Sequence, residues 1–333
     1  MHNHILIKDP TLNGWEYGML RSFENAIVQE TAAQEIIIPT YEFAPRYLGY
    51  FGQGMKRGIY RKHFPRQTFD FKADTAWHIL MGPENYRLDL YKNWTSNCRT
   101  RILYLYDTLP SQYPLIKRLF SNNTWDILIT SFNDAVDDLN KLTGRKWHCV
   151  EQAADDEIFQ SVPLNERLIH FSSYGRRYPV LHDVIKDFCK VNGLYYDYTT
   201  HDARHPVVEA AELYKQYAWH LSHSVFTLSW PVELTNPDRA GHLHPITCRW
   251  FEAAAAGTLI LGLPPDNIAF KDYFGNSMVQ AIDPREGKPS LYRKLETIWG
   301  QREVLFSKTS IERKNKINSW TWNERVKRIV SFL

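Results

Sequence analysis

The stretch HLHPITCRWFEAAAAGTLILGLP, residues 242–264, predicts a loop, a helix, an abrupt helix end and a buried strand. Thr247 is suited to the N-cap position, and residues 249–256, with four successive alanines, favour a helix that packs closely against a neighbour. Gly257 suits the left-handed position that often follows a helix, and residues 258–261 are apolar enough for an interior strand. We therefore expect an αβ unit in which small residues bring a helix close to a sheet.

Two side chains of this helix form a candidate ligand site. Arg249 and Glu252 are three residues apart, so they share one helix face near its N-terminus. A helix N-terminus attracts anions, and an acidic and a basic side chain beside it suit a ligand with hydroxyls and phosphates. An ordinary surface ion pair is the competing interpretation, and the pair taken alone favours it.

The length and composition indicate a globular protein with two domains. The chain has 333 residues, of which 44% are hydrophobic and 23% charged, enough for two domains of about 150 residues each. The formal net charge is only +3 and no stretch is dominated by lysine and arginine, so nucleic acid is not an expected partner. No apolar run approaches the length of about 18 residues that a membrane span needs, whereas contact with a membrane surface stays open.

The sequence predicts neither a bound metal nor an organic cofactor. The histidines and the four cysteines lack the spacing of a metal site. Neither a GxGxxG nor a Walker motif is present, which disfavours NAD, FAD and the nucleotide site of P-loop proteins. Scattered cysteines and the lack of a signal segment favour a cytoplasmic protein.

The first half of the chain alternates strands and helices, which is typical of a doubly wound parallel sheet. We predict strands at residues 4–7, 35–39, 76–81, 101–106 and 125–130, and a first helix at 16–29. The loops after parallel strands gather at the carboxyl edge of the sheet, where ligands bind. We place Asn13 and Gly14 at this edge, on the acceptor side, together with Asp107, which is either a general base or a turn residue.

The second half repeats the pattern. A strand at 167–171 precedes the loop SSYGRR, residues 172–177, and a helix at 179–189. Small residues and two arginines before a helix N-terminus can hold an anion, although a merely positive turn is an equal alternative. Further strands are predicted at 193–198 and 224–228, with a long polar loop at 231–243 leading to the stretch quoted above.

At this point three segments show a resemblance to GT-B type bacterial glycosyltransferases, in particular to group 1 enzymes similar to the spore-maturation glycosyltransferases. CRWFEAAAAGTLIL resembles the family's R-x-F-E-A-x-A-x-G-T segment, VEQAADDEIF resembles the crossover between the lobes, and IHFSSYGRRYPVL resembles the opening of the second lobe. WTWNERVKRIV resembles the closing helix. The resemblance implies an α/β fold of two Rossmann-like lobes facing across a cleft, with residues 1–158 on the acceptor side, 159–318 on the donor side and a closing helix at 319–333.

The resemblance also implies roles in the second lobe. Glu252 would bind the ribose hydroxyls of a nucleotide, and Arg177, with Arg176, would offset the charge on the departing diphosphate. Thr247 and the start of its helix would contact phosphate, and Arg249 would orient Glu252 or reach the phosphate itself.

His244 stands where many retaining relatives carry the first glutamate of a Glu-x7-Glu pair, so we assign it to the catalytic residues with Arg177 and Asp107. Asp107 would act as the base if the enzyme inverts configuration. The remaining donor-side positions are Ser173, Tyr174 and Pro245.

The expected function is transfer of a sugar from a nucleotide-diphosphate sugar to a hydroxyl acceptor, without a bound metal and with retention of configuration. Two alternatives stay open, because a fold does not fix a function. One is a sugar-nucleotide epimerase or hydrolase, and the other is a subunit that binds a nucleotide sugar without catalysis.

Overall fold

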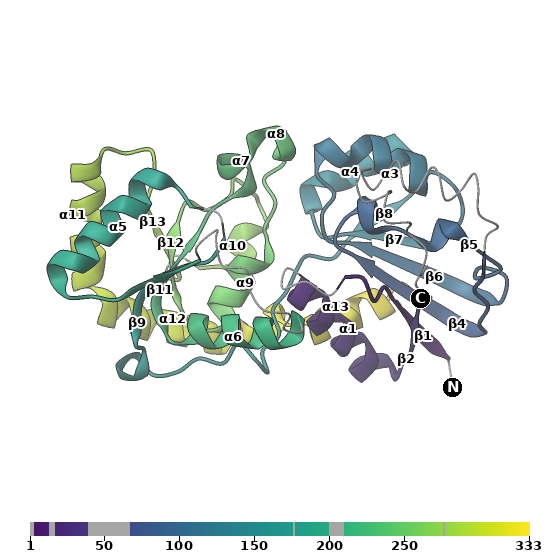
Figure 1. The fold of residues 1–333 in the computed structure, drawn as a ribbon, viewed down its shortest axis with the longest axis horizontal. Helices are drawn as coiled ribbons and strands as arrows, with labels where there is room; N and C mark the ends of the chain where they lie inside the picture. Colours follow the sequence, from purple (N-terminus) through teal and green to yellow (C-terminus); the bar gives the residue numbers. More distant parts are fainter. Residues whose placement is uncertain (1–2, 13–16, 39–66, 176, 200–209, 276) are drawn as a thin grey trace, which may run out of the picture. The chain divides into compact units, whose positions relative to one another are not determined.

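The computed structural model describes residues 3–12, 17–38, 67–175, 177–199, 210–275 and 277–333. The chain divides into two compact units (Figure 1). Unit 1 comprises residues 1–151 and 326–333, and unit 2 comprises residues 152–325. The chain therefore returns to unit 1 within its last helix, α13 (Trp322–Val330).

Unit 1 contains a parallel sheet of six strands in the order β2-β1-β4-β6-β7-β8. The strands are β1 (His4–Lys8), β2 (Gln34–Ile37), β4 (Ala73–Leu80), β6 (Cys98–Leu105), β7 (Ile127–Thr130) and β8 (Trp147–Cys149). Among the described residues, this unit contains the helices α1 (Gly18–Thr31), α3 (Tyr113–Phe120) and α4 (Val136–Thr143), and two short strands, β3 (Gln67–Thr68) and β5 (Tyr91–Lys92), pair separately. These elements confirm the predicted alternation of strands and helices in the first half of the chain.

Unit 2 contains a second parallel sheet, in the order β10-β9-β11-β12-β13. Its strands are β9 (Ile169–Ser173), β10 (Tyr196–Tyr198), β11 (Ser224–Ser229), β12 (Leu259–Gly262) and β13 (Val279–Ala281). Its helices are α5 (Pro179–Asn192), α6 (Ala210–Ser222), α7 (Val232–Thr235), α8 (Pro237–Ala240), α9 (Cys248–Ala255), α10 (Phe270–Tyr273), α11 (Lys288–Gly300) and α12 (Arg302–Lys316). Figure 1 shows α5 and α11 beside each other on one face of this sheet, with α6 and α9 on the other.

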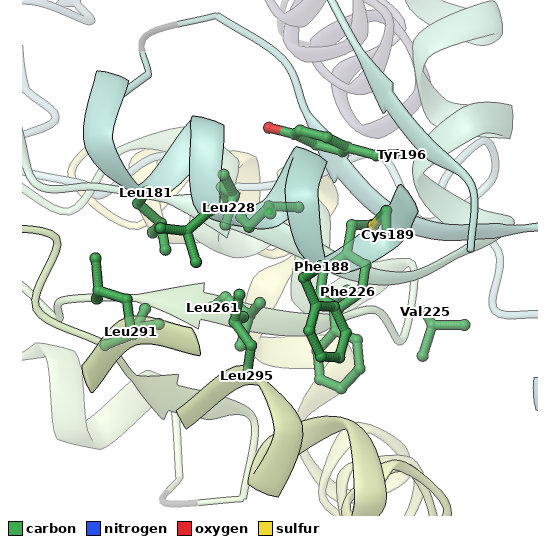
Figure 2. Packing of buried hydrophobic residues seen from close by; sticks show 14 of the residues in the cluster. Leu181, Phe188, Cys189, Tyr196, Val225, Phe226, Leu228, Leu261, Leu291 and Leu295 are labelled. Carbon is green, nitrogen blue, oxygen red and sulfur yellow. The ribbon is translucent and has the colours of Figure 1, made fainter. Parts of the chain in front are cut away.

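The core of unit 2 forms because its central strands are apolar on both faces, as a sheet covered by helices requires. All residues of β11 and β12 are buried. In Figure 2, Leu181 of α5 and Leu291 and Leu295 of α11 gather beside Leu228 and Leu261 of the strands. This packing holds the sheet rigid beneath the loops that follow its strands.

The structure corrects two predictions in this unit. Strand β9 runs to Ser173, two residues beyond the predicted end, so Ser173 belongs to the sheet rather than to the loop. The predicted polar loop at 231–243 contains two single-turn helices, α7 and α8, with Pro231 directly before the first and Pro237 at the start of the second. Proline suits these positions because its fixed φ is helical and its missing N–H has no partner to lose.

Two arginines, the buried Arg167 and the half-buried Arg313, fix the carboxyl end of α9. Arg167 donates hydrogen bonds to the carbonyl of Ala256 at 2.9 Å and to Oγ1 of Thr258 at 3.0 Å, and Arg313 donates to the carbonyl of Ala255. Burial lowers the pKa of Arg167 to about 9, which still leaves it charged at neutral pH. Positive charge is favourable here because the last carbonyls of a helix carry its negative dipole end.

The core of unit 1 contains a neutral histidine. His78 of β4 is fully buried, donates through Nδ1 to the carbonyl of Ile7 at 2.9 Å, and stacks on Trp125 with ring centroids 6.0 Å apart. Burial lowers its pKa from 6.5 to about 4, because a charged imidazole would lose its hydration there.

We expect acid to destabilise unit 1 through His78. In the unfolded chain the imidazole binds a proton below pH 6.5, whereas the folded protein resists protonation down to about pH 4. The unfolded state thus binds more protons in this window, and the free energy of unfolding should fall by about 3 kcal/mol as the pH drops through it. Urea unfolding of the wild type and of His78→Phe at pH 7.5 and at pH 4 measures this loss. Equal pH dependence in the two proteins would contradict the assignment.

Candidate functional site

The carboxyl edge of the second sheet carries most of the residues predicted for the donor side. The first strand of this sheet, β9, lies between β10 and β11. The strand order therefore reverses direction between β9 and β11. In doubly wound sheets, ligands bind outside the carboxyl ends of the strands at this switch point. Ser173 ends β9 and Ser229 ends β11, and both side chains are 1% exposed.

The structure brings together two predicted segments that are distant in sequence. Arg249 of α9 lies against Gly175 in the loop that follows β9, so closely that a Cβ on Gly175 would lie 2.6 Å from the guanidinium Nη2. Gly175 has φ +93°, which favours glycine, and its N–H donates to Oγ1 of Thr199 at 3.1 Å. The cationic side chain of Arg249 and the loop after β9 are therefore in contact at the switch point.

Glu252 is buried rather than part of a surface ion pair, so the competing interpretation of Arg249 and Glu252 is wrong. Its side chain is 1% exposed, and its two oxygens accept hydrogen bonds from the hydroxyls of Tyr214 at 2.5 Å and Tyr217 at 3.0 Å. Phe159 of the crossover segment packs edge-on against both tyrosine rings. The carboxylate is thus held between α9, α6 and the crossover.

Burial and the neighbouring groups shift the pKa values of Glu252 and Arg249 in opposite directions. Burial raises the pKa of Glu252, against the hydrogen bond from Tyr214 and the nearby charge of Arg249. Burial alone lowers the pKa of Arg249, but Tyr217 and Glu252 offset this effect and the pKa is raised. The pKa values of Tyr214 and Tyr217 rise well above their ordinary range through burial, so both remain hydrogen-bond donors.

The side chain that caps the N-terminus of α9 is not the predicted one. Thr247 occupies the N-cap position with extended backbone, as predicted, but its side chain makes no capping hydrogen bond. The N–H of Cys248 instead donates to Oε1 of Gln152 at 2.5 Å. Pro245 is buried in the preceding loop. Sequence reasoning missed Gln152 because the contact joins residues that are 96 positions apart.

His244 pairs with an acid that the sequence analysis did not single out. Its Nδ1 donates to Oε1 of Glu233 at 2.7 Å, and its own carbonyl accepts from Nδ2 of Asn267 at 2.9 Å. Glu233 lies in α7, within the predicted polar loop. The sequence did contain a signal for Glu233, because Pro231 comes two residues after the strand end and the acid two residues after the proline. A proline followed by an acid favours the first turn of a helix, which here lies beside the strand end.

A second polar group surrounds the loop after β9. Tyr174 donates through its hydroxyl to Oδ2 of Asp197 at 2.7 Å, and His220 donates to the same oxygen through Nδ1 at 2.8 Å. The hydrogen bond from His220 is the main reason that the pKa of Asp197 is lowered. Arg177 lies over the ring of Tyr198, 5.1 Å from its centroid. Asp197 and His220 were not predicted, although an acid at the end of a strand was a visible signal.

The residues predicted for the acceptor side belong to unit 1. Asp107 follows β6 at the carboxyl edge of the first sheet, is partly buried, and donates through its N–H to the carbonyl of Met81 at 2.7 Å. Asn13, Gly14 and Arg176 lie outside the residues that the structure describes.

Unit 1 also contains a cavity of about 410 Å³ at the opposite edge of its sheet. Its walls come from segments that precede β6 and β7, and include Lys92, Trp94, Arg118, Asn122 and Thr124. Asp107 lies at the other end of these strands, so this cavity is separate from the predicted acceptor-side edge.

Two further properties hold for the described ranges. No group of three or more His, Cys, Asp or Glu side chains in them is arranged to hold a metal ion. None of the helices in this part of the chain combines the length and the apolar character needed to cross a membrane.

The comparisons with known proteins identify the fold. The chain resembles a glycosyltransferase from Rickettsia africae (11% identity, TM-score 0.53, covering 99% of this chain and 97% of that one). It also resembles HepE of Anabaena, solved with UDP-glucose (10%, TM-score 0.55, 100% of both chains), and TarM (10%, TM-score 0.51, 77% of this chain and 54% of that one). No protein-family model and no curated protein matches the sequence. The likeness confirms the predicted α/β fold, with a Rossmann-like lobe in each half, that glycosyltransferases of known structure share.

The contact between Arg249 and Gly175 predicts a position-specific cost for an added methyl group. Gly175→Ala should strain a backbone with φ +93° and also displace the guanidinium, whereas Gly193→Ala should only strain a backbone with φ +64°, since nothing lies within 4 Å of its Cβ position. Overpacking typically costs about 1–3 kcal/mol beyond the backbone strain. Urea unfolding of both variants tests this difference, and equal losses would show that Arg249 does not restrain the loop.

Proposed function

We propose that the protein is a glycosyltransferase that moves a sugar from a nucleotide-diphosphate sugar to a hydroxyl of an acceptor. The observation that carries this proposal is the placement of Arg249 against Gly175, at the switch point of the second sheet. A partly buried cation, the N-terminus of α9 and an acid one helical turn further on form a site suited to a diphosphate joined to a ribose.

The likeness to solved structures supports the same class of donor. HepE, which shares the fold over the full length of both chains, was solved in complex with UDP-glucose. A nucleotide-diphosphate sugar carries phosphate charge, ribose hydroxyls and a leaving group, and these are the features that Arg249, Glu252 and Arg177 complement.

In the proposed reaction the bond between the sugar and the diphosphate breaks while positive charge develops on the sugar ring. Arg177 and Arg249 offset the negative charge that grows on the leaving diphosphate, so this charge needs no metal. Glu252 accepts hydrogen bonds from the ribose. Because the carboxylate is 1% exposed, Tyr214 or Tyr217 must turn aside for this contact. We further propose retention of configuration, with Asp107 as the base if configuration is inverted.

The products distinguish this function from its alternatives. We would screen UDP-, GDP- and TDP-sugars by thermal shift, since a ligand that binds only the folded state raises the melting temperature. A hit is then incubated with and without acceptor alcohols, and nucleotide and sugar products are separated. Acceptor-dependent release of the nucleoside diphosphate with a new glycoside supports transfer. Acceptor-independent release indicates a hydrolase, an isomerised sugar nucleotide indicates an epimerase, and binding without turnover indicates a non-catalytic subunit.

Glu252→Gln should weaken nucleotide binding. The amide keeps the size of the side chain but removes the charge that strengthens hydrogen bonds from ribose hydroxyls, so we expect about tenfold lower affinity for the nucleoside diphosphate by calorimetry. Glu296→Gln, at an exposed position of α11, is the matched control and should bind as the wild type does. Unchanged affinity in a folded Glu252→Gln protein would remove the ribose assignment.

Arg177→Ala should slow turnover more than it weakens donor binding. Removing a charge that acts on the leaving group commonly lowers kcat by about a hundredfold, because its interaction strengthens only in the transition state. Single-turnover rates and donor Kd values, measured side by side with Arg177→Lys, separate the two effects. A rate equal to that of the wild type would place Arg177 away from the phosphates.

A further inference from the structure

Glu233 and His244 form a hydrogen-bonded pair beside the carboxyl end of β11. Glu233 lies in α7, four residues after Ser229 ends the strand, and its Oε1 accepts the hydrogen bond from Nδ1 of His244 at 2.7 Å. The side chain of His244 is 39% exposed and that of Glu233 is 18% exposed. The backbone of His244 is fixed in turn by the side chain of Asn267, which donates to its carbonyl. The pair is therefore held from two segments of the same unit.

One oxygen of this pair lacks a hydrogen bond. Oε2 of Glu233 is buried and has no hydrogen-bond partner among the described residues. Leaving a buried carboxylate oxygen unsatisfied is costly, so native proteins rarely keep one without a functional reason. The same holds, within the described ranges, for Oγ of Ser229 and Nε1 of Trp230. Three of the five residues from 229 to 233 thus carry a buried polar atom that has no hydrogen-bond partner among the described residues.

The position of these atoms indicates the kind of ligand. They lie at the last residue of β11 or within the four residues that follow it, and β11 is one of the two strands at the switch point, where Arg249 and Gly175 also lie. An ionised carboxylate can accept hydrogen bonds but cannot donate them, so the partner of this oxygen must be a donor. A sugar hydroxyl donates and accepts, which suits both the carboxylate oxygen and the indole N–H of Trp230.

We infer that Oε2 of Glu233 accepts a hydrogen bond from a hydroxyl of the transferred sugar, and that His244 is a positioning residue that fixes the carboxylate through Oε1. This inference rests on the proposed function, since it assumes a nucleotide-sugar donor. It gives the proposed donor site an acid that comes from α7, outside residues 242–264.

The test separates recognition of the sugar from recognition of the nucleotide. For each nucleotide sugar that stabilises the wild type, calorimetry measures its affinity and that of the matching nucleoside diphosphate, for example UDP-glucose and UDP. Glu233→Gln should bind the nucleotide sugar about ten- to hundredfold more weakly, because it loses a charged acceptor, and should bind the nucleoside diphosphate as the wild type does. A merely structural role would lower both affinities together. Glu303→Gln, whose side chain is 75% exposed on α12, is the matched control.

A double variant tests the positioning role. His244→Gln should lose part of the same preference for the nucleotide sugar, and the Glu233→Gln, His244→Gln double variant should be no worse than Glu233→Gln alone, because the two residues act through one carboxylate. Additive losses would overturn the role of His244. If wild type and Glu233→Gln show the same ratio of the two affinities, the inference about Glu233 is wrong while the proposed function stands. If the wild type binds no nucleotide or nucleotide sugar of the panel, the proposed function itself fails.

Discussion

The arrangement at the carboxyl edge of the second sheet depends on the fixation of α9 at both of its ends. At the start, the side chain of Gln152 accepts the N–H of Cys248, and at the finish Arg167 and Arg313 hold the carbonyls of the last turn. A helix of eight residues is too short to be stable through its own hydrogen bonds. These contacts come from three other segments of the unit, so tertiary structure sets the position of the helix. The positions of its side chains are fixed in the same way.

Arg249 and Glu252 combine charge with restricted access to solvent, since the first is partly buried and the second is 1% exposed. Arg249 and Glu252 share one face of the helix, yet each is constrained by a different neighbour: the guanidinium by the loop at Gly175 and the carboxylate by two tyrosines of α6. Interactions between charges are stronger where water is excluded. In the proposed site, a ligand meets a guanidinium that the loop at Gly175 already restrains, but it must displace a tyrosine hydroxyl to reach the carboxylate.

The sequence revealed those features that depend on local pattern. Apolar runs buried on both faces identified the parallel strands, and Gly257, which has φ +64°, marked the end of α9. The Arg–Glu spacing and the SSYGRR loop were each visible in the sequence as candidate ligand-binding segments. Their nearness could not be read from either segment, because it depends on how the strands are ordered in space.

Other features of the site were out of reach because their cause is tertiary. Tyr214 and Tyr217 stand three residues apart on α6, which is visible in the sequence, but nothing local shows that both hydroxyls meet one carboxylate. Glu233 follows a strand end and a proline, which the sequence shows, but its contact with His244, 11 residues further on, cannot be read from that pattern. The pattern also gave no sign that Glu252 is buried, since a charged residue on a helix is ordinarily exposed.

The return of residues 326–333 to unit 1 has a consequence for the order in which the chain folds during its synthesis. Val326 and Ile329 are fully buried in unit 1, although they are made after the whole of unit 2. Domains generally fold as they leave the ribosome, beginning with the N-terminal one. Here the first unit to emerge lacks part of its apolar core until translation has passed through the second, so unit 2 is the first that can complete its native packing.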